Sequence, residues 1–123
     1  MSISVLLVED DMIVQQVHKA MLLKLGCEVH IANSGEQAFE MAKNNLAFRL
    51  VFVDIGLPDI SGFDVIKRLH AYYQDNAIAT TLVAVTGYCG DEEREACFNA
   101  GVMDVLNKPV VLATLREVIN KYI

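Results

Sequence analysis

The sequence predicts an α/β fold in which five parallel strands alternate with five helices. Short runs rich in β-branched and other apolar residues, typical of strands buried on both faces, recur five times along the chain. Between them, apolar residues return every three or four positions, which is the spacing of an amphipathic helix. Strands that alternate with helices in this way form a parallel sheet with right-handed crossovers.

The expected elements follow one another without a linker, a repeat or a low-complexity segment. We expect the strands at residues 3–8, 28–32, 50–53, 81–85 and 102–106. We expect the helices at residues 11–25, from the Asn33-Ser34-Gly35 turn to about residue 45, and at residues 63–73, 91–100 and 112–122. Five such units fit one domain over residues 1–123, a flavodoxin-like (βα)5 sheet in the strand order 2-1-3-4-5.

Composition and charge exclude several classes of function. The chain is 54% hydrophobic, and no apolar run approaches the roughly 18 residues of a membrane helix, which predicts a soluble, cytoplasmic domain without membrane contact. The net charge of −6 argues against nucleic-acid binding, which needs clustered basic residues. The histidines, His18, His30 and His70, are expected to be surface or structural. Cys27, Cys89 and Cys97 form no CxxC pair and are interpreted as reduced, structural thiols.

The first helix is expected to bury one apolar face and to leave further apolar residues outside it. The residues assigned to the buried face are Ile13, Val14, Val17, Met21 and Leu25. Met12, Leu22 and Leu23 are then expected off this face, so the helix would have more apolar surface than its packing needs.

Polar residues follow four of the five strands. In chain order they are Glu9-Asp10-Asp11, Asp54, Thr86 and Lys108-Pro109. In this sheet ligands bind at the carboxyl ends of strands 1 and 3, where the winding reverses, so these side chains are expected to converge there.

A group of carboxylates needs a cation. Two carboxylates ~4 Å apart repel by roughly 4 kcal/mol at an effective dielectric of 20. Mg²⁺ suits such a site, because it takes one or two carboxylates and keeps several waters. Lys108 alone would leave the cluster negative, and its ammonium is better placed to meet a phosphate.

Each of these residues also has a plainer interpretation. Acids at the start of a helix complement its dipole, and Asp54 alone could cap a turn. Thr86 could satisfy the local backbone, and Lys108 could be a solvated surface lysine. Their occurrence together at four strand ends favours a binding site.

Four segments, VLLVEDD, VDIGLPDISG, VAVTG and LNKP, resemble in order and spacing the signature segments of bacterial response-regulator receiver domains. The similarity covers essentially the whole chain. It implies that Asp54 accepts a phosphoryl group from the phosphohistidine of a histidine kinase or a histidine phosphotransfer domain. It further implies that the domain catalyses only its own phosphorylation and slow hydrolysis, without being a turnover enzyme.

The resemblance also implies the roles of the residues around Asp54. Mg²⁺ would be bound by Asp10 directly, by Glu9 largely through water, by Asp54, and by the backbone carbonyl of Gly56. The phosphoryl group would be bound by the Thr86 hydroxyl, the Gly87 amide and Lys108, with Pro109 following a cis peptide bond.

The sequence departs from the family pattern at Val105, three positions before Lys108. Most receivers have an aromatic residue there that rotates inward when the residue at the Thr86 position moves, so the usual aromatic switch is in doubt. The segments ANSG, DIGLPDISG and MDVLNKP most resemble receivers inside hybrid sensor kinases, which pass phosphate to a histidine phosphotransfer domain. A free-standing single-domain response regulator is the alternative.

A docking surface for that partner is expected beside the acceptor site. Ile13, Val14, Pro109 and Val110 would form an apolar rim around Asp54, suited to a four-helix phosphotransfer domain. The alternative is that Ile13 and Val14 are core residues.

Three other functions share parts of this pattern. A haloacid-dehalogenase-type phosphohydrolase would have its nucleophile on strand 1 in an Asp-x-Asp pair, usually with a cap. A flavodoxin-like electron carrier would need hydroxyls and amides in its first loop, where the acids of this chain would repel phosphate. A pseudo-receiver scaffold is disfavoured, because every acceptor-site residue is present.

Overall fold

The computed structural model describes residues 3–44, 48–57, 59–87 and 90–123. The strands are β1 (Ile3–Val8), β2 (Cys27–Ala32), β3 (Leu50–Asp54), β4 (Thr81–Thr86) and β5 (Asp104–Asn107). The helices are α1 (Met12–Lys24), α2 (Gly35–Asn44), α3 (Gly62–Asp75), α4 (Asp91–Ala100) and α5 (Leu112–Tyr122). The strands form one parallel sheet in the order β2-β1-β3-β4-β5, which confirms the predicted fold class.

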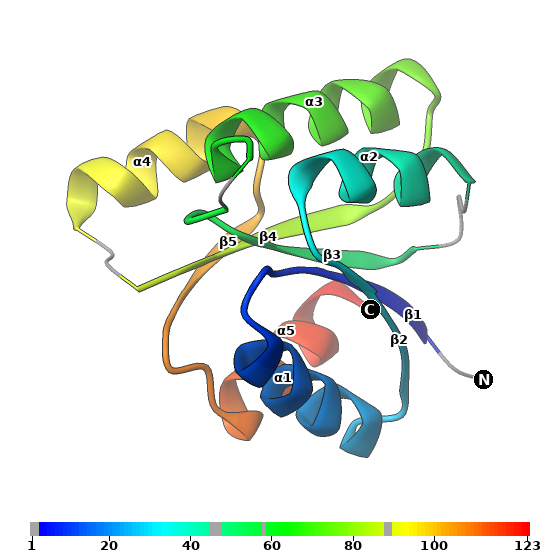
Figure 1. The fold of residues 1–123 in the computed structure, drawn as a ribbon, viewed down its shortest axis with the longest axis vertical. Helices are drawn as coiled ribbons and strands as arrows, with labels where there is room; N and C mark the ends of the chain where they lie inside the picture. The colour runs from blue at the N-terminus through cyan, green and yellow to red at the C-terminus, as the bar shows by residue number, and fades with distance from the viewer. Residues whose placement is uncertain (1–2, 45–47, 58, 88–89) are drawn as a thin grey trace.

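The sheet forms the middle of three layers (Figure 1). Helices α2, α3 and α4 cover one face, and α1 and α5 cover the other. Because successive side chains of a strand point to opposite faces, β1 supplies Leu6 and Val8 to the first core and Val5 and Leu7 to the second. The apolar strands are therefore buried on both sides, as their sequences predict. Among the described residues, no helix is long and apolar enough to cross a membrane.

The predicted buried face of α1 is only partly right, because Met21 and Leu25 pack against the core but Ile13 and Val17 do not. Ile13 is 76% exposed and Val17 is 50% exposed, whereas the buried residues of the helix are Gln15, His18 and Leu22. Gln15 is buried because its side-chain amide donates to the Glu9 carbonyl oxygen and to Asn33 Oδ1, both at 2.7 Å. These two acceptors satisfy the N–H groups of the amide. The face of α1 that carries Gln15 therefore points toward the sheet.

Met12 and Leu23 are exposed, as predicted, but Leu22 is fully buried in the core shared with α5. Cys27 and Cys97 are buried and are not in a disulfide, in agreement with their structural interpretation, and Cys89 lies outside the described residues.

A close approach between α3 and β3 depends on Gly62. A Cβ atom at this position would lie 2.4 Å from the Ile55 Cα and 2.6 Å from the Asp54 carbonyl oxygen. The first turn of α3 therefore packs directly on the backbone that follows β3. This contact with α3 restrains the backbone of Asp54.

Candidate functional site

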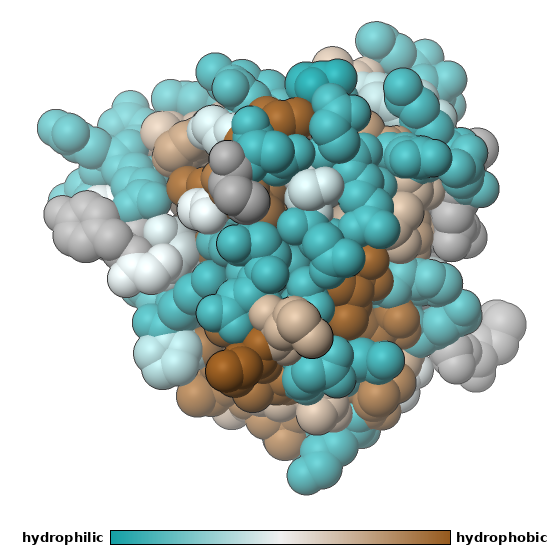
Figure 2. Space-filling model, in the orientation of Figure 1, coloured by the Kyte–Doolittle hydropathy of each residue, from teal (hydrophilic) through white to brown (hydrophobic). Residues whose placement is uncertain are grey.

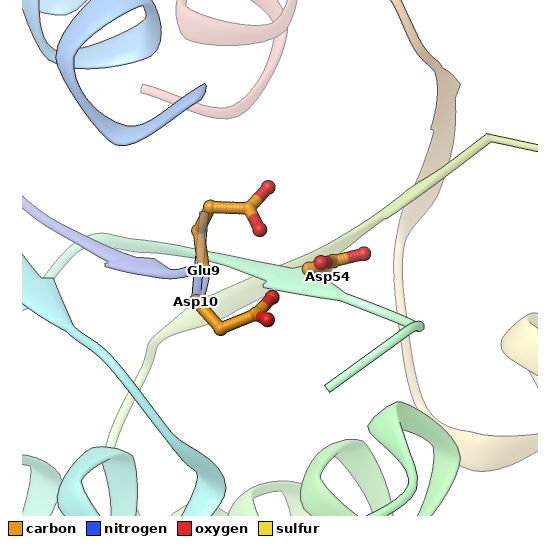
Figure 3. Close-up of side chains that lie close together, drawn as sticks. All are labelled: Glu9, Asp10 and Asp54. Atoms are coloured by element: carbon orange, nitrogen blue, oxygen red, sulfur yellow. The ribbon is translucent and has the colours of Figure 1, made fainter. Parts of the chain in front are cut away.

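Three carboxylates gather at the carboxyl edge of the sheet (Figure 3). One oxygen each from Glu9, Asp10 and Asp54 lies within 4.8 Å of the other two. The register explains this arrangement, because Val8 pairs with Val53 and the next residue of each strand is acidic. Glu9 and Asp54 are buried, and Asp10 is exposed. The predicted convergence of acids from strands 1 and 3 is confirmed.

Lys108 brings an ammonium to this cluster from the end of β5. Its Nζ lies 2.9 Å from Glu9 Oε1 and 3.4 Å from Asp54 Oδ1. Burial lowers the pKa of Lys108, but the hydrogen bond to Glu9 and the charge of Asp54 outweigh that effect and raise it overall. The lysine is therefore charged at neutral pH and offsets one of the three carboxylates.

Burial next to Asp54 makes the charged form of Glu9 unfavourable. Burial, followed by the hydrogen bond with Asp54, raises the pKa of Glu9 to about 7, although the hydrogen bond from Lys108 lowers it. Excess negative charge and hard oxygen donors are the properties that a divalent cation such as Mg²⁺ requires. The residues present thus fit the predicted metal.

The segment that follows β1 is held by hydrogen bonds on both sides of the acidic pair. Asp11, to which no role was assigned from the sequence, caps α1 by accepting from the backbone amides of Ile13 at 2.8 Å and Val14 at 3.1 Å. The Asp11 amide donates to Glu9 Oε2 at 3.3 Å. Together with Gln15, Asp11 fixes the backbone that carries Glu9 and Asp10.

The loop after β3 is tied in a similar way. The Gly56 amide donates to Asp54 Oδ1 at 3.1 Å. Asp59 accepts from the first amides of α2, those of Gly35 at 3.1 Å and Glu36 at 3.3 Å, and the Gly35 bond in particular lowers the pKa of Asp59. Sequence reasoning missed Asp59, because its partners are distant in the chain. The role of the Gly56 carbonyl stays a prediction.

On the opposite side, Thr86 ends β4 and is 4% exposed. Its hydroxyl donates to Glu93 Oε1 of α4 at 2.9 Å, and its carbonyl accepts from the Lys108 amide at 2.8 Å. Gly87 follows and is exposed. Val105 occupies the position where most receivers have an aromatic switch residue. Its side chain is buried in the core beneath α2, α3 and α4.

A cavity of about 380 Å³ lies beside Lys108. Its lining residues are Ile13, Val14, Val17, His18, Lys108, Pro109 and Val110, which include all four predicted docking residues. Ile13 is not a core residue, because most of its surface is exposed, and the Lys108–Pro109 peptide bond is cis as expected. Figure 2 shows that apolar surface gathers on the side of the sheet where α1 and α5 lie, whereas the side of α2, α3 and α4 is largely hydrophilic.

His18 is buried and lies between two parts of this region. It lines both the apolar cavity and a small space beneath Asp54. Burial lowers the pKa of His18, and the neighbouring Lys108 charge lowers it further. The histidine is therefore neutral at pH 7 and is a structural residue, as one of the sequence interpretations proposed.

Comparisons with known proteins identify this arrangement. Residues 5–120 match the response regulator receiver domain family. The chain is 37% identical over 121 residues to the aerobic respiration control sensor protein ArcB of Escherichia coli, and 33% identical over 123 residues to hybrid signal transduction histidine kinase L of Dictyostelium discoideum. These matches cover 98% and 96% of this chain but only 15% and 7% of the two relatives.

Two solved structures are also similar. One is the receiver domain of the sensor histidine kinase PA1611 of Pseudomonas aeruginosa, with a magnesium ion coordinated in its active-site cleft. It has 29% identity and a TM-score of 0.87, with 99% of this chain and 98% of that chain covered. The other is the receiver domain of the Saccharomyces cerevisiae response regulator Ssk1 in complex with the histidine phosphotransfer protein Ypd1. It has 27% identity and a TM-score of 0.90, with coverage of 98% and 88%.

An open α/β sheet with acids, a hydroxyl and an ammonium at its carboxyl edge is the class of structure used for signalling by two-component systems. The chain belongs to the response regulator receiver domain family.

Proposed function

We propose that this chain accepts a phosphoryl group from a phosphohistidine onto Asp54, as the receiver of a phosphorelay. The observation that carries the proposal is the position of the Asp54 carboxylate, which is buried next to Glu9 and Asp10 and 3.4 Å from the Lys108 ammonium. A nucleophilic carboxylate and a cation that meets the incoming phosphate thus lie side by side.

The transfer is a substitution at phosphorus. An Asp54 carboxylate oxygen forms a P–O bond while the P–N bond to the donor histidine breaks, and the released imidazole nitrogen keeps that electron pair. Lys108 offsets charge on the phosphoryl oxygens as a flexible point charge. The Thr86 hydroxyl and the Gly87 amide hold the phosphoryl group once it is attached to Asp54.

Glu9, Asp10, Asp54 and the Gly56 carbonyl would hold Mg²⁺. When bound, the ion would neutralise charge that develops on the phosphoryl oxygens. The magnesium ion in the similar Pseudomonas aeruginosa receiver supports this assignment. The three carboxylates that converge at this edge, two of them buried, support it independently.

The donor or acceptor partner is a histidine phosphotransfer domain, and the whole protein is a hybrid histidine kinase. The relative named a hybrid histidine kinase, the receiver domain of the sensor histidine kinase PA1611 and the yeast receiver bound to a phosphotransfer protein support this context. The apolar cavity beside Lys108 supports docking at Ile13, Val14, Pro109 and Val110. A free-standing single-domain response regulator is the second candidate.

Intact-mass measurement after incubation with acetyl phosphate and Mg²⁺ tests the proposal. The wild type should gain one phosphoryl group, and Asp54→Asn, which keeps the shape of the side chain, should gain none. An adduct on Asp54→Asn contradicts the acceptor assignment. Continuous release of phosphate without a stable adduct would instead indicate a hydrolase.

A further inference from the structure

The hydrogen bond between Thr86 and Glu93 connects the end of β4 to the first turn of α4. Thr86 Oγ1 donates to Glu93 Oε1 at 2.9 Å. Thr86 is buried and Glu93 is half-buried, so this pair is partly shielded from water. The bond closes the segment between β4 and α4, on the side of the site where the phosphoryl group would be held.

The chemistry of the hydroxyl forces a competition. A threonine hydroxyl has one proton and can donate it to one acceptor at a time. An ionised carboxylate only accepts, and so do the oxygens of a phosphoryl group. While Glu93 receives this proton, Thr86 cannot donate it to a phosphoryl group on Asp54.

We propose that Glu93 is a positioning residue that holds the Thr86 hydroxyl away from the phosphoryl site. Phosphorylation of Asp54 transfers this hydrogen bond from Glu93 to the phosphoryl group and releases the first turn of α4. The inference rests on the proposed function, and it adds a residue that sets how readily the phosphorylated state forms.

The construction of α4 fits such a release. Its buried residues are Cys97 and Ala100, both in the second half of the helix. The first turn contains three acids and begins at Gly90, which makes no side-chain capping bond. Loss of the Thr86 bond would therefore loosen the first turn of α4, while its second half stays packed on α3 and β5. This route needs no aromatic residue at Val105.

Binding of beryllofluoride with Mg²⁺ tests the inference, because this anion mimics the phosphoryl group without chemistry. Glu93→Gln keeps the side-chain shape but replaces the charged acceptor with a neutral one, so beryllofluoride affinity should rise about fivefold, the effect of weakening one charge-assisted hydrogen bond. Glu92→Gln is the matched control, because Glu92 is exposed and lies in the same turn. It removes the same charge and should leave the affinity close to that of the wild type.

A double-mutant cycle separates positioning from a general charge effect. In a Thr86→Ala background, Glu93→Gln should no longer change the affinity, because no hydroxyl is left to compete for. Equal affinities for Glu93→Gln and Glu92→Gln, or a Glu93→Gln effect that persists without the hydroxyl, would overturn the inference. If the wild type binds no beryllofluoride and forms no phosphoryl adduct, it is the proposed function that fails.

Amide NMR spectra provide a second readout. In the wild type, beryllofluoride should shift the amide resonances of residues 91–93. In Glu93→Gln without beryllofluoride, these resonances should already lie part of the way toward the bound positions, as a population shift requires. Unchanged resonances at residues 91–93 in the bound wild type would contradict the release of α4.

Discussion

The two sides of the candidate site differ in how many side-chain hydrogen bonds restrain the backbone. On the side of β1 and β3, Asp11, Gln15 and Asp59 each make two hydrogen bonds that fix the backbone around the acids. On the side of β4, the helix cap at Gly90 makes no side-chain hydrogen bond, and Thr86 is held by a carboxylate with which a phosphoryl group would compete.

Such a difference would allow one site both to bind a phosphoryl group and to signal that it is bound. Groups that bind a metal and a nucleophile need fixed geometry, which packing and hydrogen bonds around them supply. A segment that reports the reaction must have two arrangements of similar free energy. Under the proposed function, different strand ends of this chain would meet the two requirements.

The largest expected effect compares two glycines across the site. Gly62→Ala should destabilise the protein by about 3 kcal/mol, because its Cβ would overlap the backbone of Ile55 and Asp54. Gly87→Ala should change the free energy of unfolding little, since no described residue outside its chain neighbours has an atom within 4 Å of a Cβ there. Urea unfolding measures both. Similar losses of stability in the two variants would show that the sides do not differ.

The next prediction concerns the strain on the acidic side. Lys108 pairs with Glu9 and Asp54, so the Asp10 charge is left without a partner among these groups. Asp10→Asn should therefore be more heat-stable than the wild type in EDTA. It should also bind Mg²⁺ at least tenfold more weakly, or about 1.4 kcal/mol, as measured by Mg²⁺-linked stabilisation. Equal Mg²⁺ affinities would contradict the metal assignment.

Docking of a phosphotransfer partner should depend on the exposed apolar residues of α1, on the side of β1. Ile13→Lys places a charge at the mouth of the apolar cavity and should slow transfer from a phosphorylated histidine phosphotransfer protein about tenfold. Phosphorylation by acetyl phosphate should be unchanged, because a small donor needs no docking surface and Ile13 is mostly exposed.

Leu23→Lys is the control for this variant. Leu23 is also exposed on α1 but does not line the cavity, so transfer should be normal. If Ile13→Lys slows both donors alike, the effect comes from the site itself, and docking lies elsewhere.

The smallest effects compare the two helix caps. Asp11→Ala removes a cap with two hydrogen bonds and should lower the free energy of unfolding by about 1 kcal/mol. Gly90→Ser gives α4 a side chain that can cap it, in backbone geometry that any residue adopts, and should raise stability by a few tenths of a kcal/mol. Thermal denaturation without Mg²⁺ measures both changes. A loss of stability in Gly90→Ser would mean that α4 is already well capped.

The positions of the strands and the convergence of Glu9, Asp10 and Asp54 could be predicted from the sequence. Carboxyl ends of adjacent parallel strands meet at one edge, so the acid after each strand is placed by topology alone. The boundaries differ little, with β5 beginning at Asp104 instead of residue 102.

The buried face of α1 and the partners of Thr86 and Asp59 could not be predicted in this way. Gln15 is buried because of a carbonyl oxygen and an asparagine in other segments, and helical periodicity treats any glutamine as exposed. Asp59 accepts from an amide of α2 that is 24 residues away in the chain, and the Thr86 bond joins the end of β4 to α4. Non-local hydrogen bonds of this kind leave no periodic signal.

The ion pair between Lys108 and Glu9 joins residues that are 99 positions apart. Because β3 and β4 lie between β1 and β5 in the sheet, the pair can form only when the order β1-β3-β4-β5 is complete. A contact between residues so far apart in the chain forms slowly, because the intervening chain must lose conformational entropy before the contact stabilises it. A growing chain therefore brings its acids together before it acquires the ammonium that offsets them. Under the proposed function, the lysine that meets the phosphoryl group would therefore be in place only after β5 has joined the sheet.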